Sequence, residues 1–434
     1  MKIPVHRLKH ALELVEPAVA RKATLPITQN VLFQEGKLVA TNLELAVAAD
    51  MPEAAGFRHT LPYKLLVDVL RHIPNTEIAS IERDGGTVTL TAGGTRVTLH
   101  GTDAADFPPL PAVPGERELV DGDRFLKALV AAVPYTATAD SYPVLRAVCV
   151  TLGDVIEVAG TDGFRLAWQE IPLKLTGAGS GLKQLLVPRE TVLALDKVWK
   201  RAIKPPAEGS AFIGAAGSQF PSPDLNQAPP INTGPSPSLA MARMAVAKRM
   251  MQVRFQTNQA SFQFGEATVY TQLLVGEFPN YQQMIPEGQP SKVTFDAEET
   301  YRVVRMLAPV AAEGSNIIRM EWEGQAMKLS AQAEETGSVS STIPVTAHGE
   351  PGRIAFNSKY LVEYLAGKYG LVLMESSSPS SPGRFTHAGS ANMVLMPMFV
   401  APINAEGSAS IGAAPESDPP EEEEDAHAQQ TEGP

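Results

Sequence analysis

The stretch Val158-Ala159-Gly160-Thr161-Asp162-Gly163-Phe164-Arg165-Leu166-Ala167-Trp168 decides the fold. It predicts a strand, a tight corner at Thr-Asp-Gly, and a second strand with an apolar face. Residues 38–48 align with it without a gap, 120 positions earlier in the chain. Each copy follows a proline-containing segment and precedes a helix that opens at proline, Pro62 or Pro188. A repeat of this length indicates duplicated domains, because solenoid units are much shorter.

Three such units account for most of the 434 residues. The predicted units are residues 1–114, 115–288 and 289–402. Apolar periodicity predicts two helices in each unit, at 4–16, 62–73, 122–132, 188–203, 296–308 and 358–368. Strands and meanders between them, in place of βαβ alternation, predict an α+β fold with antiparallel sheets. Phe-Pro closes both of the first two units, at Phe107 and at Phe278.

Two segments depart from this pattern. Residues 205–240 are dense in Pro, Gly, Ser and Ala, which is typical of a flexible surface insertion, and a short helix is expected after them at 241–250. Residues 403–434 carry nine Asp and Glu and no Lys or Arg, which predicts a disordered acidic tail. Without that tail, 39 acids face 36 bases, so the folded body is close to neutral although the whole chain has a net charge of -12.

Nothing in the sequence predicts a membrane segment or a secretory signal, and the chain is expected in the cytoplasm. Its one cysteine, Cys149, lies in an apolar strand. A single cysteine forms no internal disulfide, and this one is expected to be a small buried apolar side chain rather than a reactive thiol.

Basic side chains gather on the polar faces of the predicted helices. On the helix at 188–203 and the residue after it, five of them share an arc of about 120°: Arg189, Lys197, Lys200, Arg201 and Lys204. Smaller pairs occur elsewhere: Lys64 with Arg71, Arg124 with Lys127, and Arg302 with Arg305. For any one helix this is an ordinary solvated face. Repeated over three units, it favours a duplex held through its phosphates without base reading.

The sequence contains no pattern for catalysis. It has no phosphate-binding loop, dinucleotide fingerprint or nucleophile elbow. His6 and His10 have the spacing of a metal pair, but no Glu follows the first of them, so neither a metal nor another cofactor is expected. Asp162 is expected to form a turn rather than to act as an acid. The chain is therefore not expected to be an enzyme.

Five motifs, in this order, resemble the β subunit of bacterial DNA polymerase III, the sliding clamp family: Thr24-Leu25-Pro26-Ile27, Ala105-Asp106-Phe107-Pro108, Thr161 to Ala167, Gly276 to Tyr281, and Val394-Leu395-Met396-Pro397-Met398. The resemblance covers residues 1–400. It implies three similar domains per chain and a head-to-tail homodimer that forms a ring. Such a ring encircles double-stranded DNA, with helices lining the hole, and tethers the polymerase.

The resemblance also implies two sets of contact residues. Lys22, Arg71 and the loop 139–144, with Pro143 and Val144, match DNA-contacting positions. A pocket for short motifs of the replicative polymerase, the clamp loader and repair proteins matches Leu145, Thr161, Gly163, Phe164, Arg165, Leu166, Pro279, Met284, Val394, Met396, Pro397 and Met398. Methionines and aliphatic side chains suit an adaptable cleft, although the same residues could be ordinary core.

The chain departs from the family in three ways, of which the insertion at 205–240 is one and has no assigned role. Phe164 stands where the family usually has His, so the preferred motif is expected to differ. The tail is an addition that either solubilises the chain or competes with DNA for basic surface. The alternative function is a clamp-like protein-binding scaffold that does not encircle DNA.

Overall fold

The computed structural model describes residues 1–22, 25–139, 142–175, 183–203 and 249–399. The predicted insertion at 205–240, the acidic tail at 403–434, Lys204 and nearly all of the short helix at 241–250 lie outside these residues. The fold is α+β, as predicted. The described helices are α1 (Val5–Val15), α2 (Tyr63–Arg71), α3 (Gly122–Ala132), α4 (Arg189–Ala202), α6 (Ala297–Glu313) and α7 (Ser358–Leu365).

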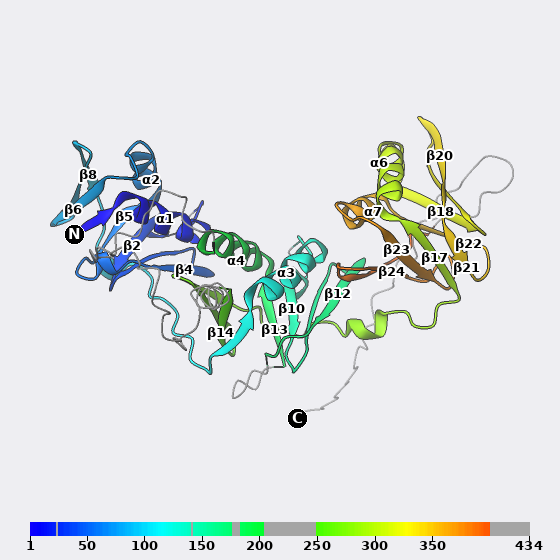
Figure 1. Ribbon diagram of the computed structural model, residues 1–434, viewed down its shortest axis with the longest axis horizontal. Helices are drawn as coiled ribbons and strands as arrows, with labels where there is room; N and C mark the ends of the chain where they lie inside the picture. The colour runs from blue at the N-terminus through cyan, green and yellow to red at the C-terminus, as the bar shows by residue number, and fades with distance from the viewer. Residues whose placement is uncertain (23–24, 140–141, 176–182, 204–248, 400–434) are drawn as a thin grey trace, which may run out of the picture.

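The strands form four antiparallel sheets. The two end sheets have four strands each. One is β1 (Lys2–Pro4), β6 (Ile78–Asp84), β7 (Thr87–Ala92) and β8 (Thr95–His100), and the other is β20 (Gly337–Pro344), β19 (Ala326–Ala333), β18 (Ile317–Glu323) and β22 (Gly352–Asn357). In each of these sheets one edge strand, β8 or β20, lies at an end of the molecule (Figure 1).

Two longer sheets lie between them. The first has the order β5 (His59–Pro62), β2 (Asn30–Gln34), β3 (Lys37–Thr41), β4 (Leu45–Asp50), β16 (Ala267–Gln272), β15 (Gln259–Phe264), β14 (Met250–Gln256), β9 (Glu118–Asp121). The second has the order β13 (Gln184–Pro188), β10 (Ala147–Thr151), β11 (Ile156–Thr161), β12 (Arg165–Ile171), β25 (Asn392–Leu395), β24 (Gly383–His387), β23 (Leu371–Ser376), β17 (Ser291–Asp296), β21 (Thr346–His348).

Each longer sheet joins two repeats. β4 of the first repeat pairs with β16 of the second, and β12 of the second pairs with β25 of the third. Figure 1 shows the result as an open arc, with the helices along its concave side and the sheets outside. The helices are amphipathic because their apolar stripes cover the inner faces of the sheets, which leaves their polar faces toward the concavity. Among the described residues, no helix is both long enough and apolar enough to span a bilayer.

The predicted helices are found within a few residues, except that α6 continues beyond the predicted end at residue 308. Pro309 lies inside this helix, which runs on to Glu313. A proline in a helix interior removes one backbone hydrogen bond and disfavours the helix locally. Leu307 and Ala311 on either side are buried in the core, and this packing keeps the last turn helical.

Cys149 is buried, as predicted, and burial raises the pKa of its thiol to about 12. The core divides unevenly: one apolar cluster runs through the first two repeats, and a second fills the third repeat. α4 packs against both α1 and α3, which ties the first two repeats together.

An ionic cluster crosses the junction between the first and second repeats. His10 Nε2 lies 2.8 Å from Glu266 Oε1, and Arg7 on the same helix lies between Glu266 and Glu53. Glu266 belongs to the turn between β15 and β16, so the bond joins two repeats. The hydrogen bond from His10, aided by the charges of His10 and Arg7, holds the pKa of Glu266 below its usual value although partial burial opposes this. His10 is thus occupied by a carboxylate.

We expect Glu266→Gln to lower the free energy of unfolding near pH 7 by about 0.5 kcal/mol, the size of a half-exposed ion pair. A carboxylate whose pKa is lowered by folding stabilises the fold above its unfolded pKa, and that stabilisation is lost as pH falls through the folded pKa. Urea unfolding should therefore show the difference from wild type at neutral pH and lose it in acid. Glu170→Gln, an exposed change on β12, is the control, and an equal deficit for Glu266→Gln at both pH values would contradict the assignment.

Candidate functional site

Two short side chains build the corner between β11 and β12. Thr161 Oγ1 donates to the carbonyl oxygen of Arg165 at 2.8 Å, and Asp162 Oδ1 accepts from the backbone N–H groups of Phe164 and Arg165 at 3.0 Å each. Gly163 has φ +90°, a region that costs glycine little. The Asp162 carboxylate therefore serves the turn, as predicted, and is not a free acid.

The first repeat has the same corner. Thr41 Oγ1 donates to the carbonyl oxygen of Leu45 at 3.0 Å, and Asn42 Oδ1 accepts from the N–H groups of Glu44 and Leu45 at 3.1 and 2.8 Å. Leu43 takes the place of the glycine and has φ 80°. The repeat that the sequence predicts is thus confirmed at the level of single hydrogen bonds.

The residues predicted to line the motif pocket gather where β12 pairs with β25 on the sheet side of the arc, and the pocket that they are proposed to form is here called the outer cleft. Leu166 and Val394 are opposite each other in the ladder, and Met396 N–H donates to the Phe164 carbonyl at 2.9 Å. Leu145, Leu166 and Val394 are buried in one cluster and form the floor, with Thr161 buried beside them. The remaining predicted members are more accessible: Phe164 is 64% exposed and Met284 38%, Gly163 and Pro279 are exposed, and Met396, Pro397 and Met398 are half-buried.

The sequence prediction did not include two residues of the floor of the outer cleft. Phe278 and Tyr281 are both buried in the cluster of the outer cleft, with their rings edge to face at 5.9 Å. The Tyr281 hydroxyl donates to Glu157, which fixes the ring. The available signal was the Phe-Pro pair that closes each of the first two repeats: Phe107 occupies the corresponding place in the first repeat, against Leu32 and Val39.

Arg165 was predicted to line the pocket, and the structure corrects this. Successive side chains of a strand point to opposite faces, so Arg165 points away from Leu166 and lies on the helix side of the sheet. Its guanidinium bonds Asp162 Oδ2 at 2.9 Å, the Pro134 carbonyl at 2.7 Å and the Glu363 carboxylate on α7. It also stacks over Tyr360, with the guanidinium carbon 4.3 Å from the ring centre. Arg165 thus ties the second repeat to the third.

The corresponding position between the first and second repeats has different chemistry. There Gln272 N–H donates to the Glu44 carbonyl at 3.0 Å, in the same relation as Met396 to Phe164. Glu44 and Gln272 therefore take the places of Phe164 and Met396. A polar, acidic rim favours apolar ligands less than an aromatic and a thioether do. The outer cleft is in this respect particular to the second junction.

Most of the predicted DNA-contacting bases are exposed to solvent. Those exposed are Lys22, Arg71, Arg124, Lys127, Lys197 and Lys200. Three of them face an acid on their own helix or at its N-cap: Arg71 with Asp68 at 3.6 Å, Arg124 with Asp121 at 3.7 Å, and Lys200 with Asp196 at 2.6 Å. Exposed pairs of this kind are weak, so these cations remain available to a phosphate.

Four predicted DNA-contacting residues lie elsewhere or are engaged. Arg189 is half-buried and donates to the Val133 carbonyl at 2.7 Å and to Thr136 Oγ1 at 3.1 Å. Arg201 bonds Glu16 and the Glu13 carbonyl, which links α4 to α1. Val144 packs against the cluster of the outer cleft, next to the exposed Pro143. The uniformly solvated stripe predicted on α4 is therefore wrong, because its two arginines serve helix packing.

Comparisons with known proteins agree with this architecture. The family model "DNA polymerase III beta subunit, N-terminal domain" matches residues 1–111, and "DNA polymerase III beta subunit, C-terminal domain" matches residues 282–393. A beta sliding clamp of Synechocystis is 27% identical over 422 residues, covering 92% of this chain and 98% of that protein. One from Synechococcus elongatus is 26% identical over 374 residues, covering 83% and 88%. The crystal structure of DNA polymerase III subunit beta from Pseudomonas aeruginosa has the same fold, with a TM-score of 0.74 at 21% identity, covering 92% of this chain and 99% of that one.

We expect Arg165→Ala to lower the free energy of unfolding by about 2 kcal/mol, because removal of one partner of a buried ion pair leaves the other charge uncompensated. The loss is smaller than for a fully buried pair because Glu363 is half-exposed. The matched control is Lys174→Ala, which removes a fully exposed pair with Asp154 at 2.8 Å and should leave the free energy of unfolding nearly unchanged. Urea unfolding measures both. A small and equal effect of the two substitutions would show that Arg165 does not join the repeats.

Proposed function

Since the chain belongs to the beta sliding clamp family of DNA polymerase III subunits, we propose that two copies close head to tail into a ring around double-stranded DNA. The ring would act as a processivity factor that holds the replicative polymerase on its template. The observation that carries this proposal is the matching pair of free strand edges at the two ends of the arc. The proposed units are residues 1–114, 115–288 and 289–402.

The sheet order indicates how the ring would close. Each repeat has two sets of four strands, and β21 adds a fifth strand to one set of the third repeat. The last strands of these sets correspond: β4, β12 and β20 in one set, β8, β16 and β25 in the other. Within the chain, β4 pairs with β16 and β12 pairs with β25. The remaining members are β20 at one end and β8 at the other, each at the edge of a four-stranded sheet. Pairing of β20 with β8 of a second copy, at both ends, would repeat the internal junction and cover both of these edges.

The concave helices supply the surface that would face the DNA. Their exposed bases are spread over all three repeats and lie on long, solvated side chains. Lys and Arg contacts to phosphate release counterions and do not depend on base sequence. Encirclement then provides retention, while the individual contacts stay loose enough for the ring to slide.

The outer cleft would receive partner proteins. A buried aliphatic floor with a rim of Phe164, Met284 and Met396 suits a short apolar motif in an otherwise disordered segment. Flexible thioethers let one cleft accept several sequences, which fits a replicative polymerase, a clamp loader and repair proteins that take turns. Phe164 at the rim would shift the preferred motif toward aromatic or aliphatic side chains.

The protein would perform no chemistry of its own and would work in the cytoplasm, where the chromosome lies. It is proposed to need no cofactor. A protein-binding scaffold that does not encircle DNA is less well supported, because it leaves the β8 and β20 edges without a role.

We expect the double substitution Met396→Ala with Met398→Ala to weaken binding of a clamp-binding polymerase peptide by about tenfold, or about 1.4 kcal/mol, through lost apolar contact. Calorimetry with the full-length dimer measures the affinity, and size-exclusion chromatography with light scattering should show an unchanged dimer. Met306→Ala, which removes an exposed methionine of α6, is the control. Unchanged peptide affinity in the double variant would exclude both methionines from the site.

We expect the wild-type ring, placed by its loader on a nicked circular plasmid, to stay bound through gel filtration and to be released when the plasmid is cut once. Val339→Asp on β20 should abolish retention on the circle, because it places a charge at the closing edge and weakens the dimer by at least about tenfold. Val155→Asp, an exposed change in the middle repeat, should behave as wild type. Circular dichroism checks the fold of both variants. Equal retention of wild type before and after cutting would refute encirclement.

A further inference from the structure

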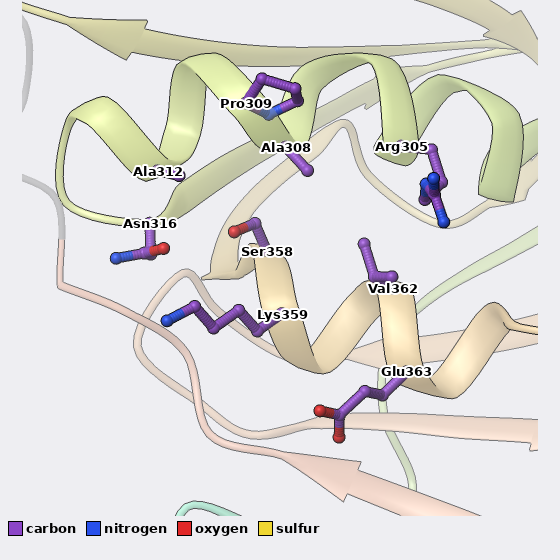
Figure 2. Close-up of a pocket in the computed structure, with 9 residues that line it drawn as sticks. All are labelled: Arg305, Ala308, Pro309, Ala312, Asn316, Ser358, Lys359, Val362 and Glu363. Atoms are coloured by element: carbon purple, nitrogen blue, oxygen red, sulfur yellow. The ribbon is translucent and has the colours of Figure 1, made fainter.

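A groove of about 440 Å³ lies between α6 and α7, on the side of these helices that faces away from the sheets. Ala308, Pro309 and Ala312 of α6 and Val362 of α7 line it, and Figure 2 shows Ala308 pointing toward Val362, with Asn316 and Ser358 at one end and Arg305 near the other. The walls are mostly apolar. Its two helices, α6 and α7, lie on the concave side of the third repeat (Figure 1). This groove, here called the inner groove, shares no lining residue with the outer cleft.

The sequence explains why space is left between the two helices here. Pro309 has no N–H, and its ring crowds the carbonyl of Arg305 one turn earlier, so α6 has a weakened turn facing α7. Small side chains at 308 and 312 leave the space unfilled. Two cations flank it, Arg305 and Lys359. Within the described part of the chain neither has an ion pair, whereas Glu363 beside them is held by Arg165.

The chain leaves the described fold close to this groove. Met398 N–H donates to the Ala355 carbonyl at 2.8 Å, and Ala355 precedes Ser358, the first residue of α7, by three positions. Three residues of strand span about 10 Å. Phe399 follows and is 82% exposed. The five residues from Phe399 to Ile403 can cover at most about 18 Å when extended. The path from Ala355 to Val362 is about 16 Å, because the helical turn from Ser358 to Val362 adds about 6 Å, so Ile403 can reach the level of Val362.

The segment that follows has the complementary chemistry. Ile403 is the first apolar residue far enough along the chain from Met398 to reach Val362, and Glu406 is the first acid after it. The stretch 403–434 contains nine acids and no Lys or Arg. An aliphatic side chain fits an Ala-Pro-Val wall, and an acid three residues further along reaches the level of Arg305.

We propose that the inner groove binds this chain's own C-terminal segment, with Ile403 between Pro309 and Val362 and Glu406 paired with Arg305. The acids beyond Glu406 then extend over the concave face of the same subunit. In a protein that encircles DNA, the tail occupies phosphate-binding cations until duplex enters. The docking does not depend on the proposed function, and only the competition with DNA rests on it.

The second repeat lacks this combination. α4 begins at Arg189 as α7 begins at Ser358, so Glu190 corresponds to Lys359 and Leu193 to Val362. An acid in place of Lys359 repels an acidic segment. Leu193 therefore offers a matched control position on an equivalent helix.

Disulfide trapping in the full-length dimer tests the docking. The native Cys149 is buried and will not compete for oxidation. Under mild oxidant, Val362→Cys with Ile403→Cys should form an intramolecular disulfide, detected by peptide mass spectrometry and by migration as a single chain on a non-reducing gel. Ala312→Cys, at an exposed groove position, gives a second anchor should Val362→Cys disturb packing. Leu193→Cys with Ile403→Cys is the control.

The charge pair is tested by reversal. Arg305→Glu in the Val362→Cys background should lower the trapping yield about three- to fivefold, the size of one exposed ion pair, and adding Glu406→Arg should restore it. Yields equal to the Leu193 control, disulfides that link two chains, or failure of the charge swap to restore the yield would each overturn the proposal.

The competition is a separate measurement. A loaded circular duplex should lower the trapping yield, and a mixture with free plasmid but no loader should not. An unchanged trapping yield on loaded DNA would refute the competition between the tail and DNA, but not the docking. Loss of plasmid retention by the wild-type protein would instead count against encirclement.

Discussion

Strand pairing across the junctions is the constraint on which the rest of this structure depends. β4 with β16 and β12 with β25 continue one backbone hydrogen-bond ladder from repeat to repeat. At each junction, the N–H and C=O groups of two strand edges that would otherwise be unpaired bond to each other. A continuous ladder leaves little freedom in the angle between repeats. Because every repeat covers the same sheet face with its two helices, a fixed angle brings all the helices to one side, and the chain curves around them (Figure 1).

The same pairing also creates the outer cleft. Once β25 is bonded to β12, Phe164 and Met396 are neighbours and Leu166 faces Val394. The first junction has the same backbone geometry with Glu44 and Gln272 at the rim, so backbone topology supplies two similar sites and side-chain chemistry makes only one of them apolar. Directly behind the cleft, on the other face of β12, Arg165 fixes the third repeat to the second. Neighbouring residues of one strand therefore serve ligand access and domain attachment.

Local patterns predicted the fold well because the decisive contacts are local. The Thr-Asp-Gly corner is held by bonds within five residues, and the helices follow from apolar spacing. What failed depends on distant partners. The bond between Arg165 and Glu363 on another repeat, and the bonds of Arg189 and Arg201 to carbonyls and acids far along the chain, could not be read from local spacing. The continuation of α6 past Pro309 depends on core packing around Leu307 and Ala311. The limits of the repeats and the contact residues for DNA remain predictions.

The loss of two arginines from the predicted basic stripe suits a surface that must not hold DNA too firmly. Arg71, Arg124 and Lys200 each have a carboxylate within 4 Å, and such exposed pairs reduce the charge that a phosphate meets without removing it. A row of unopposed cations would bind one register of the duplex backbone tightly and resist translation along it. Where a closed ring already prevents escape, each contact can be weak. The near neutrality of the folded body, 39 acids against 36 bases once the tail is set aside, is then a property expected of a clamp that slides.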